Sequence, residues 1–270
     1  MNTTFGMKTM FDIKNMLMKS GSIKPCLKMT WMEAKLFLRE PVGAFFTLAF
    51  PLIMLFIFGA IYSNVPAGAG SGGPEGIGSL IPAFMSMVIG ISGLMAVTIT
   101  MATYRENGVL RRLRTTPVSP LVVMAAQVAV VFTMTALGTL LLIAAGRLVY
   151  GVQFEGNAFS LLAGFVLSSL SFFGIGFILA GTMPTARTAQ VIAMVLVYPM
   201  LIFSGAAWPR ELMPAAVQKV SAFVPLTYVV NLLHGLWSGQ LWGDHLLDVG
   251  VLAGMLVLGV IVSVKTFRWE

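Results

Sequence analysis

Long runs of apolar residues constrain the fold of this chain more than any other feature of its sequence. A helix of ~20 residues crosses the hydrocarbon core of a bilayer, so an apolar run of roughly eighteen or more residues predicts a transmembrane helix. A barrel would instead need segments of about ten residues with alternating polarity, which these runs lack. We expect an all-α integral membrane protein with six spans. They lie near residues 43–63, 80–103, 121–146, 158–182, 189–207 and 246–264.

The composition supports the same class. Hydrophobic residues make up 57% of the 270 residues and charged residues only 10%, whereas a typical soluble domain has about 25% charged residues. The mean hydropathy is +0.90. The sequence therefore predicts a protein that folds within a membrane.

The basic residues are divided unequally between the two sides of the predicted spans. One side receives fourteen of the 17 Lys and Arg residues, and the other receives only Arg147, Arg210 and Lys219. Cytoplasmic flanks of transmembrane helices collect basic residues. We therefore expect an inner (plasma) membrane protein with both termini in the cytoplasm. Contact with anionic lipid accounts for the net charge of +7, so no nucleic acid partner is expected.

The predicted spans contain no Asp, Glu, Lys or Arg at depth. Arg147 and Asp248 stand at span ends, where a charged side chain can reach the interface. Ion-coupled carriers commonly bury ionisable groups in their spans. This pattern disfavours a secondary carrier, which remains a rival interpretation.

No enzymatic or metal site is predicted in the chain. It contains neither a G-x-S-x-G nucleophile motif nor a G-x-x-x-x-G-K-[ST] phosphate loop. His234, Asp244 and His245 offer too few ligands, at an unsuitable spacing, for zinc. We expect no cofactor in this chain, and any nucleotide must bind to another protein.

The ends of the chain and its longer connections suggest further elements. Residues 1–28 are expected to form a cytoplasmic tail, and residues 29–41 a short interfacial helix before the first span. Residues 210–237 predict two short helices that dip into the outer leaflet, with an interfacial anchor as the alternative. Small residues such as Ser86 and Gly90 in the second span indicate close helix packing, with a mildly polar lining as the alternative.

A short basic segment separates the second and third spans. It reads YRENGVLRRLRTTPVSP, residues 104–120. As a helix it places Val109, Leu110 and Leu113 on one face and the arginines of residues 111–114 on the other. Such a helix can lie flat on the inner leaflet or dock onto a cytoplasmic partner.

Three stretches of the sequence resemble the type-2 ABC exporter permease family, which includes daunorubicin-resistance permeases and polysaccharide exporters. Residues 105–119 fit the pattern R-E-x-G-x-L-R-R-L-R-x-T-P-x-S of its cytoplasmic loop. Residues 38–59 are similar to the start of its first span, and residues 203–237 to its signature between spans five and six. Asn107 departs from the pattern, because many members carry a second acidic residue there.

The resemblance implies that residues 29–270 form an ABC-2 type transmembrane domain. Its basic loop would be a coupling helix that docks onto a separate ATPase, and the external helix pair a re-entrant hairpin. Two copies of the permease, identical or paralogous, would associate with two ATPase subunits that bind ATP and Mg. The implied coupling residues are Arg105, Glu106, Gly108, Leu110, Arg111, Arg112, Leu113, Arg114 and Pro117.

The expected function is therefore that of a permease subunit in an ATP-driven exporter of a hydrophobic or amphipathic substrate. Export of a polysaccharide or of sodium by the same family remains an alternative. A non-transporting scaffold or sensor that holds a cytoplasmic partner is another. The candidate path or gate residues are Ser86, Thr98, Ser204, Trp208, Tyr228 and Asn231.

Overall fold

A computed structural model describes residues 45–63, 73–109, 120–207 and 213–266. Within these ranges the chain is helical and contains no strand. Six of the described helical stretches are long and apolar enough to cross a membrane, which confirms the predicted all-α class and the six spans. The predicted tail, the interfacial helix and most of the basic segment lie outside the described residues.

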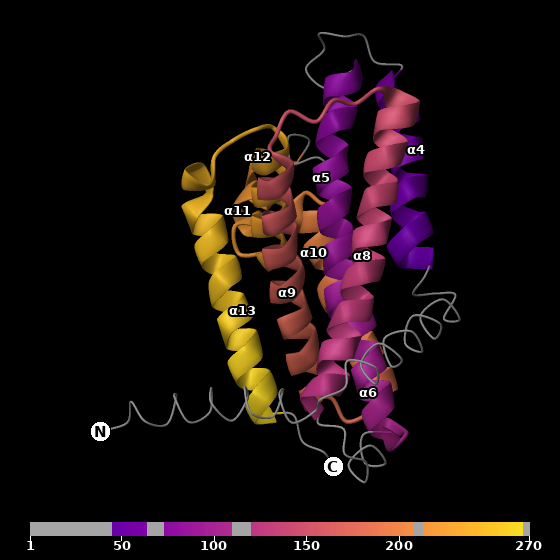
Figure 1. Ribbon diagram of the computed structural model, residues 1–270, viewed down its shortest axis with the longest axis vertical. Coiled ribbons are helices and arrows are strands. Elements are labelled where there is room, and N and C mark those ends of the chain that lie inside the picture. Colours follow the sequence, from indigo (N-terminus) through magenta and orange to yellow (C-terminus); the bar gives the residue numbers. More distant parts are fainter. Residues whose placement is uncertain (1–44, 64–72, 110–119, 208–212, 267–270) are drawn as a thin grey trace.

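The helices run up and down the long axis of the molecule (Figure 1). In chain order the longer ones are α4 (Phe50–Ser63), α5 (Gly73–Ile91), α6 (Thr98–Glu106), α8 (Pro120–Tyr150), α9 (Ala158–Thr182), α10 (Ala186–Ser204), α12 (Pro225–Trp237) and α13 (Leu246–Thr266). The shorter ones are η1 (Phe45–Ala49), η2 (Ser92–Val97), α11 (Ala215–Ser221) and η4 (Trp242–His245).

The helix ends differ by a few residues from the predicted span ends. α6 continues to Glu106 and α8 to Tyr150, because hydropathy marks the edge of the bilayer core while a helix can extend beyond it. α10 begins earlier than predicted, after Thr185. The Thr185 side chain accepts a hydrogen bond from the Thr188 amide at 3.2 Å and caps the helix. α10 ends at Gly205, whose φ of 89° suits glycine.

The second span lies at the centre of the bundle. α5, η2 and α6 form one span, and 89% of its most apolar window is buried inside the chain. At Gly93 an added Cβ would lie 2.6 Å from Cβ of Phe172 in α9, so only glycine allows this approach. The Thr98 hydroxyl then donates to the Gly176 carbonyl at 3.1 Å. Small residues here serve helix packing, as the sequence indicated.

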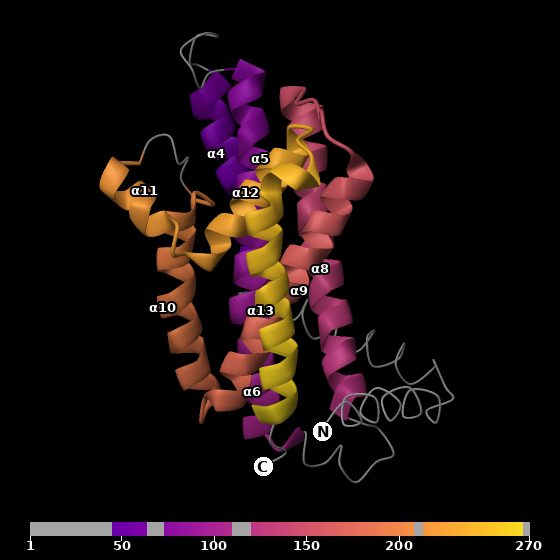
Figure 2. The ribbon, with the colours of Figure 1, turned by 90° about the vertical axis from the view of Figure 1, so that its left-hand side faces the viewer.

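α9 and α13 also touch through glycine. A Cβ on Gly259 would lie 2.8 Å from the Gly174 Cα. The Ser171 hydroxyl donates to the Leu252 carbonyl at 2.8 Å and joins the same two helices. These contacts fix the last span against the fourth, side by side in both views (Figures 1 and 2).

The predicted external helix pair is present as α11 and α12, which meet at an angle of 96°. α12 inserts among the spans, and its Val229, Leu232 and Leu233 side chains are fully buried. In and just after α11, the apolar side chains of Val220 and Phe223 are exposed, at 50% and 88%. α12 therefore belongs to the core, whereas α11 lies at its edge (Figure 2).

Candidate functional site

The first candidate site lies at the end of the bundle where α6 stops and α9 connects to α10. The Arg105 guanidinium donates to the Gly181 carbonyl in the last turn of α9 at 2.9 Å. The Glu106 carboxylate accepts from the backbone amide of Ala186, the first residue of α10, at 2.7 Å. We call these two contacts the Arg105–Glu106 clamp. It ties the end of the second span to the fourth and fifth spans.

Helix electrostatics explain the order of the two charges in the clamp. The C-terminal end of a helix presents unpaired carbonyls and attracts a cation, while the N-terminal end presents unpaired amides and attracts an anion. Arg105 meets the C-terminal end of α9 and Glu106 meets the N-terminal end of α10. The adjacent Arg-Glu pair therefore matches both helix ends that face it.

Glycine directs the chain out of α6 immediately after the clamp. Gly108 has φ of 65°, in the left-handed region that favours glycine, and its amide donates to the Arg105 carbonyl at 3.1 Å. The basic segment follows. Its predicted coupling residues Leu110, Arg111, Arg112, Leu113, Arg114 and Pro117 lie outside the described residues, as does Trp208.

Three of the candidate path residues are fully buried and hydrogen-bonded within the chain. The Ser86 hydroxyl donates to the Pro82 carbonyl, and Thr98 joins α6 to α9. Ser204 Oγ accepts from the Ala206 amide at 3.2 Å. In this conformation the three side chains pack between helices, and their place on a transport path stays a prediction.

The other two described path candidates lie on α12. The Tyr228 hydroxyl donates to the Ala222 carbonyl at 2.7 Å and holds the bend between α11 and α12. Asn231 lines a cavity of about 490 Å³ and approaches the Asp248 carboxylate at 3.5 Å. The structure does not bring these residues together with Ser86, Thr98 and Ser204 in one cavity.

Polar residues gather around Asp248 in the cavity that Asn231 lines. His245 Nδ1 lies 2.9 Å from Asp248 Oδ2, and His245 Nε2 lies 2.8 Å from the Gln240 side-chain oxygen. The sequence suggested that Asp248 reaches the interface, but its side chain is buried beside α12. His245 is only three residues from Asp248 in the sequence, whereas Asn231 comes from α12. No group of three or more His, Cys, Asp or Glu suited to a metal ion occurs among the described residues.

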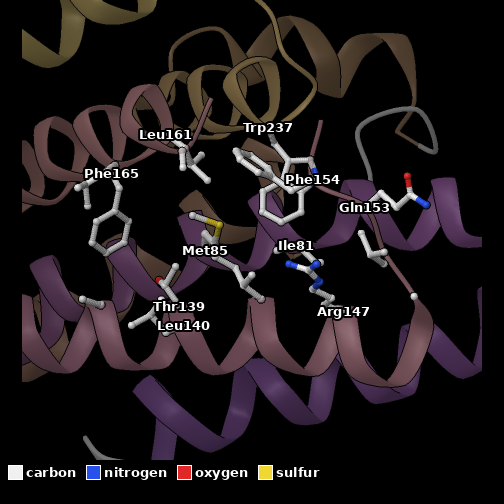
Figure 3. Close-up of a pocket in the computed structure, with 16 residues that line it drawn as sticks. Ile81, Met85, Thr139, Leu140, Arg147, Gln153, Phe154, Leu161, Phe165 and Trp237 are labelled. Atoms are coloured by element: carbon white, nitrogen blue, oxygen red, sulfur yellow. The ribbon is translucent and has the colours of Figure 1, made fainter. Parts of the chain in front are cut away.

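A second cavity, of about 880 Å³, lies between α5, α8, α9 and α12. Its wall is mainly apolar and includes Met85, Leu161 and Phe165, with Arg147 at one end (Figure 3). Sequence reasoning missed this cavity because its lining comes from four helices that are far apart in the chain. The only signal was the spacing of Thr139, Ile143 and Arg147, which places them on one face of α8.

Comparison with known proteins places the chain in a family. Residues 25–236 match the model of the ABC-2 type transporter family. Nodulation protein J of Rhizobium leguminosarum bv. viciae is 28% identical over 102 residues, which cover 38% of this chain and 39% of that protein.

Two Escherichia coli K12 proteins are also similar. The inner membrane transport permease YhhJ is 26% identical over 57% of this chain and 43% of its own length. The probable multidrug ABC transporter permease YbhR is 21% identical over 57% of this chain and 42% of its own length. The matches thus span about two fifths of these relatives. Because the family model covers most of the sequence, the chain belongs to the ABC-2 type transporter family.

Proposed function

We propose that this chain is the transmembrane permease subunit of an ATP-driven ABC exporter in the inner (plasma) membrane. Family membership and six apolar helices support the assignment. The observation that best supports this assignment is the Arg105–Glu106 clamp, because it links the start of the basic segment to two further spans. A movement of that segment would therefore be transmitted through these contacts to α9 and α10.

The orientation follows from the basic residues. Arg105 and Arg187 lie at the end of the bundle that carries the clamp, while Arg147 and Lys219 lie toward the opposite end. The basic segment begins at the clamp, since Arg105 and Glu106 are among its first residues. The positive-inside rule then puts the clamp and both termini in the cytoplasm.

ATP is bound and hydrolysed by a separate ABC ATPase in this proposal, with two copies of each subunit per transporter. Arg111, Arg112 and Arg114 contact the ATPase, since a guanidinium can bind a carboxylate through two parallel hydrogen bonds. Glu106, which the resemblance assigned to the ATPase contact, transmits motion instead, because its carboxylate holds the end of α10. Closure of the ATPase pair thereby shifts α9 and α10 together.

The proposed substrate is hydrophobic or amphipathic. A large apolar cavity among the spans supports this class. The printed name of one relative, a probable multidrug ABC transporter permease, points the same way. A polysaccharide or sodium substrate, or a role as a scaffold, are the competing proposals.

Transport assays in inside-out membrane vesicles separate these proposals. Vesicles that contain the chain and its ATPase should accumulate amphipathic dyes when ATP is supplied, and vesicles without the chain should not. ATP-dependent uptake of sodium but of no dye would assign the chain to ion export. The absence of any ATP-dependent uptake across dyes, sodium and polysaccharide would favour the scaffold.

A further inference from the structure

The cavity between α5, α8, α9 and α12 has a gradient of polarity along the bundle axis. Arg147, Gly151 and Gln153 line it where α8 ends and the connection to α9 begins. Its other end, around Ala136 and Phe165, lies about two to three helical turns deeper, or roughly 12–17 Å at the rise of an α-helix. A polar end near the interface and an apolar interior match the polarity of a lipid molecule.

The side of the cavity is open between α8 and α9. Leu140 and Leu162 line it and remain 63% and 55% exposed. Both belong to helices long and apolar enough to cross a membrane, so this exposed apolar surface suits contact with the hydrocarbon of the bilayer. A chain of methylene groups can therefore enter from the membrane without crossing water.

Aromatic residues form the wall of the cavity near its polar end. The rings of Phe154 and Trp237 lie 4.9 Å apart between centroids at an angle of 58°. This pair closes the cavity on the side of α12, near Arg147 (Figure 3).

Arg147 supplies a positive charge at the polar end of the cavity. No carboxylate pairs with it among the residues that the structure describes. In Figure 3 its side chain extends from α8 toward the cavity. The planar guanidinium can bind a phosphate through two hydrogen bonds. An anionic headgroup would pair with this cation.

We propose that this cavity binds an anionic phospholipid of the bilayer, with the phosphate at Arg147 and one hydrocarbon chain between α8 and α9 as far as Phe165. A volume of about 880 Å³ is within the usual range for a small-molecule site, roughly 300–1,000 Å³. The buried Thr139 hydroxyl has no described partner. The same cavity supports the proposed substrate class, but binding of the lipid here does not require that the lipid be exported.

Lipid titration tests the proposal on the full-length permease in detergent, with any subunit that co-purifies. Phosphatidylglycerol and phosphatidylcholine with identical acyl chains are compared by native mass spectrometry. The wild type should retain phosphatidylglycerol at least tenfold more strongly. Arg147→Gln should abolish this preference, whereas the matched control Arg187→Gln, at the other end of the bundle, should keep it. Equal retention of both lipids by the wild type would overturn the proposal.

Filling the cavity provides a second, independent measurement. Phosphatidylglycerol with a photoreactive diazirine in its acyl chain should label residues 136–165 in the wild type. Ala136→Trp should remove this labelling, and the same substitution at exposed Ala129, outside the cavity, should not. If Ala136→Trp does not fold, Leu162→Trp at the exposed rim serves, with Phe159→Trp as its control.

Two results would contradict the assignment. One is labelling that survives in the filled variants. The other is labelling of the cavity by a diazirine-bearing free fatty acid but not by the phospholipid. That result would show that the cavity binds a fatty acid and not a phospholipid.

Discussion

At the scale of single residues, Glu106 joins the basic segment to the rest of the bundle. Its carboxylate accepts the Ala186 amide at 2.7 Å, a contact between residues 80 positions apart. Loss of a side chain that caps a helix start costs about 0.5–2 kcal/mol. Such a loss is small compared with the apolar burial of six spans, so a variant without this carboxylate should still fold.

We therefore predict that Glu106→Ala reaches normal membrane levels and still binds the ATPase through the arginines, but loses stimulation of ATP hydrolysis by substrate. Measurement of ATPase activity in the purified complex, with and without an amphipathic ligand, checks this. Glu155→Ala removes an exposed carboxylate between α8 and α9 and should change nothing. Full stimulation in Glu106→Ala would exclude the clamp as a transmission route.

The sequence could not show the contacts of Glu106. The family pattern begins with Arg105 and Glu106, so the resemblance implied coupling residues at both positions, which stays a prediction. The resemblance assigned both to the ATPase contact, since a sequence shows charges without their partners. Only the fold, in which α9 and α10 pack against α6, shows that the Gly181 carbonyl and the Ala186 amide are their partners.

At the scale of helices, glycine contacts set the distance between the second and fourth spans. A Cβ at Gly93 would meet Phe172 Cβ at 2.6 Å and its backbone carbonyl carbon at 2.9 Å. Backbone atoms cannot move aside as a flexible side chain can. Overpacking of this kind costs typically about 1–3 kcal/mol.

Gly93→Ala should therefore lower the temperature at which the detergent-solubilised protein unfolds and aggregates, measured by fluorescence-detected size exclusion. Gly254→Ala is the matched control, because a Cβ there meets nothing within 4 Å. This control should be neutral or slightly stabilising, since alanine favours a helix over glycine. An equal effect of both substitutions would show that the Gly93 contact does not determine helix packing.

Prediction of the helices succeeded where hydropathy alone decides and failed where the fold decides. The apolar runs predicted all six spans to within a few residues of the observed helix ends. At the end of α8 the helix continues past the predicted span, to Tyr150. The pair α11 and α12 was expected from its short apolar segments. That α12 becomes part of the core could not be predicted, because its burial depends on contacts with other helices, such as that of Leu226 with Gly90 of α5.

At the scale of the whole molecule, the orientation in the membrane can be tested at two exposed positions. With Cys26 replaced by Ser, cysteines are introduced singly at Glu155 and Arg187, at opposite ends of the bundle. In intact cells an impermeant thiol reagent should label the cysteine at residue 155 and not that at residue 187. Labelling should become equal after the cells are permeabilised. The reverse pattern in intact cells would invert the proposed topology.

The cavities are also properties of the whole molecule. Each takes its lining from four or more segments, and no local pattern in the sequence announces such a space. The predicted spans contain no charged residue at depth, and the lining of the larger cavity is mainly apolar. Its volume and the position of Arg147 at its polar end depend on how α8 and α9 diverge.

The central claim is that a separate ABC ATPase docks on the basic segment of this chain. Affinity purification of the tagged chain from its native membrane, followed by identification and quantification of bound proteins by mass spectrometry, tests it most directly. The account predicts one ABC ATPase subunit per permease chain. It also predicts loss of that subunit, at unchanged permease level, when Arg111, Arg112 and Arg114 are all replaced by Glu. Recovery of no nucleotide-binding protein, or its full retention by the charge-reversed variant, would contradict the account.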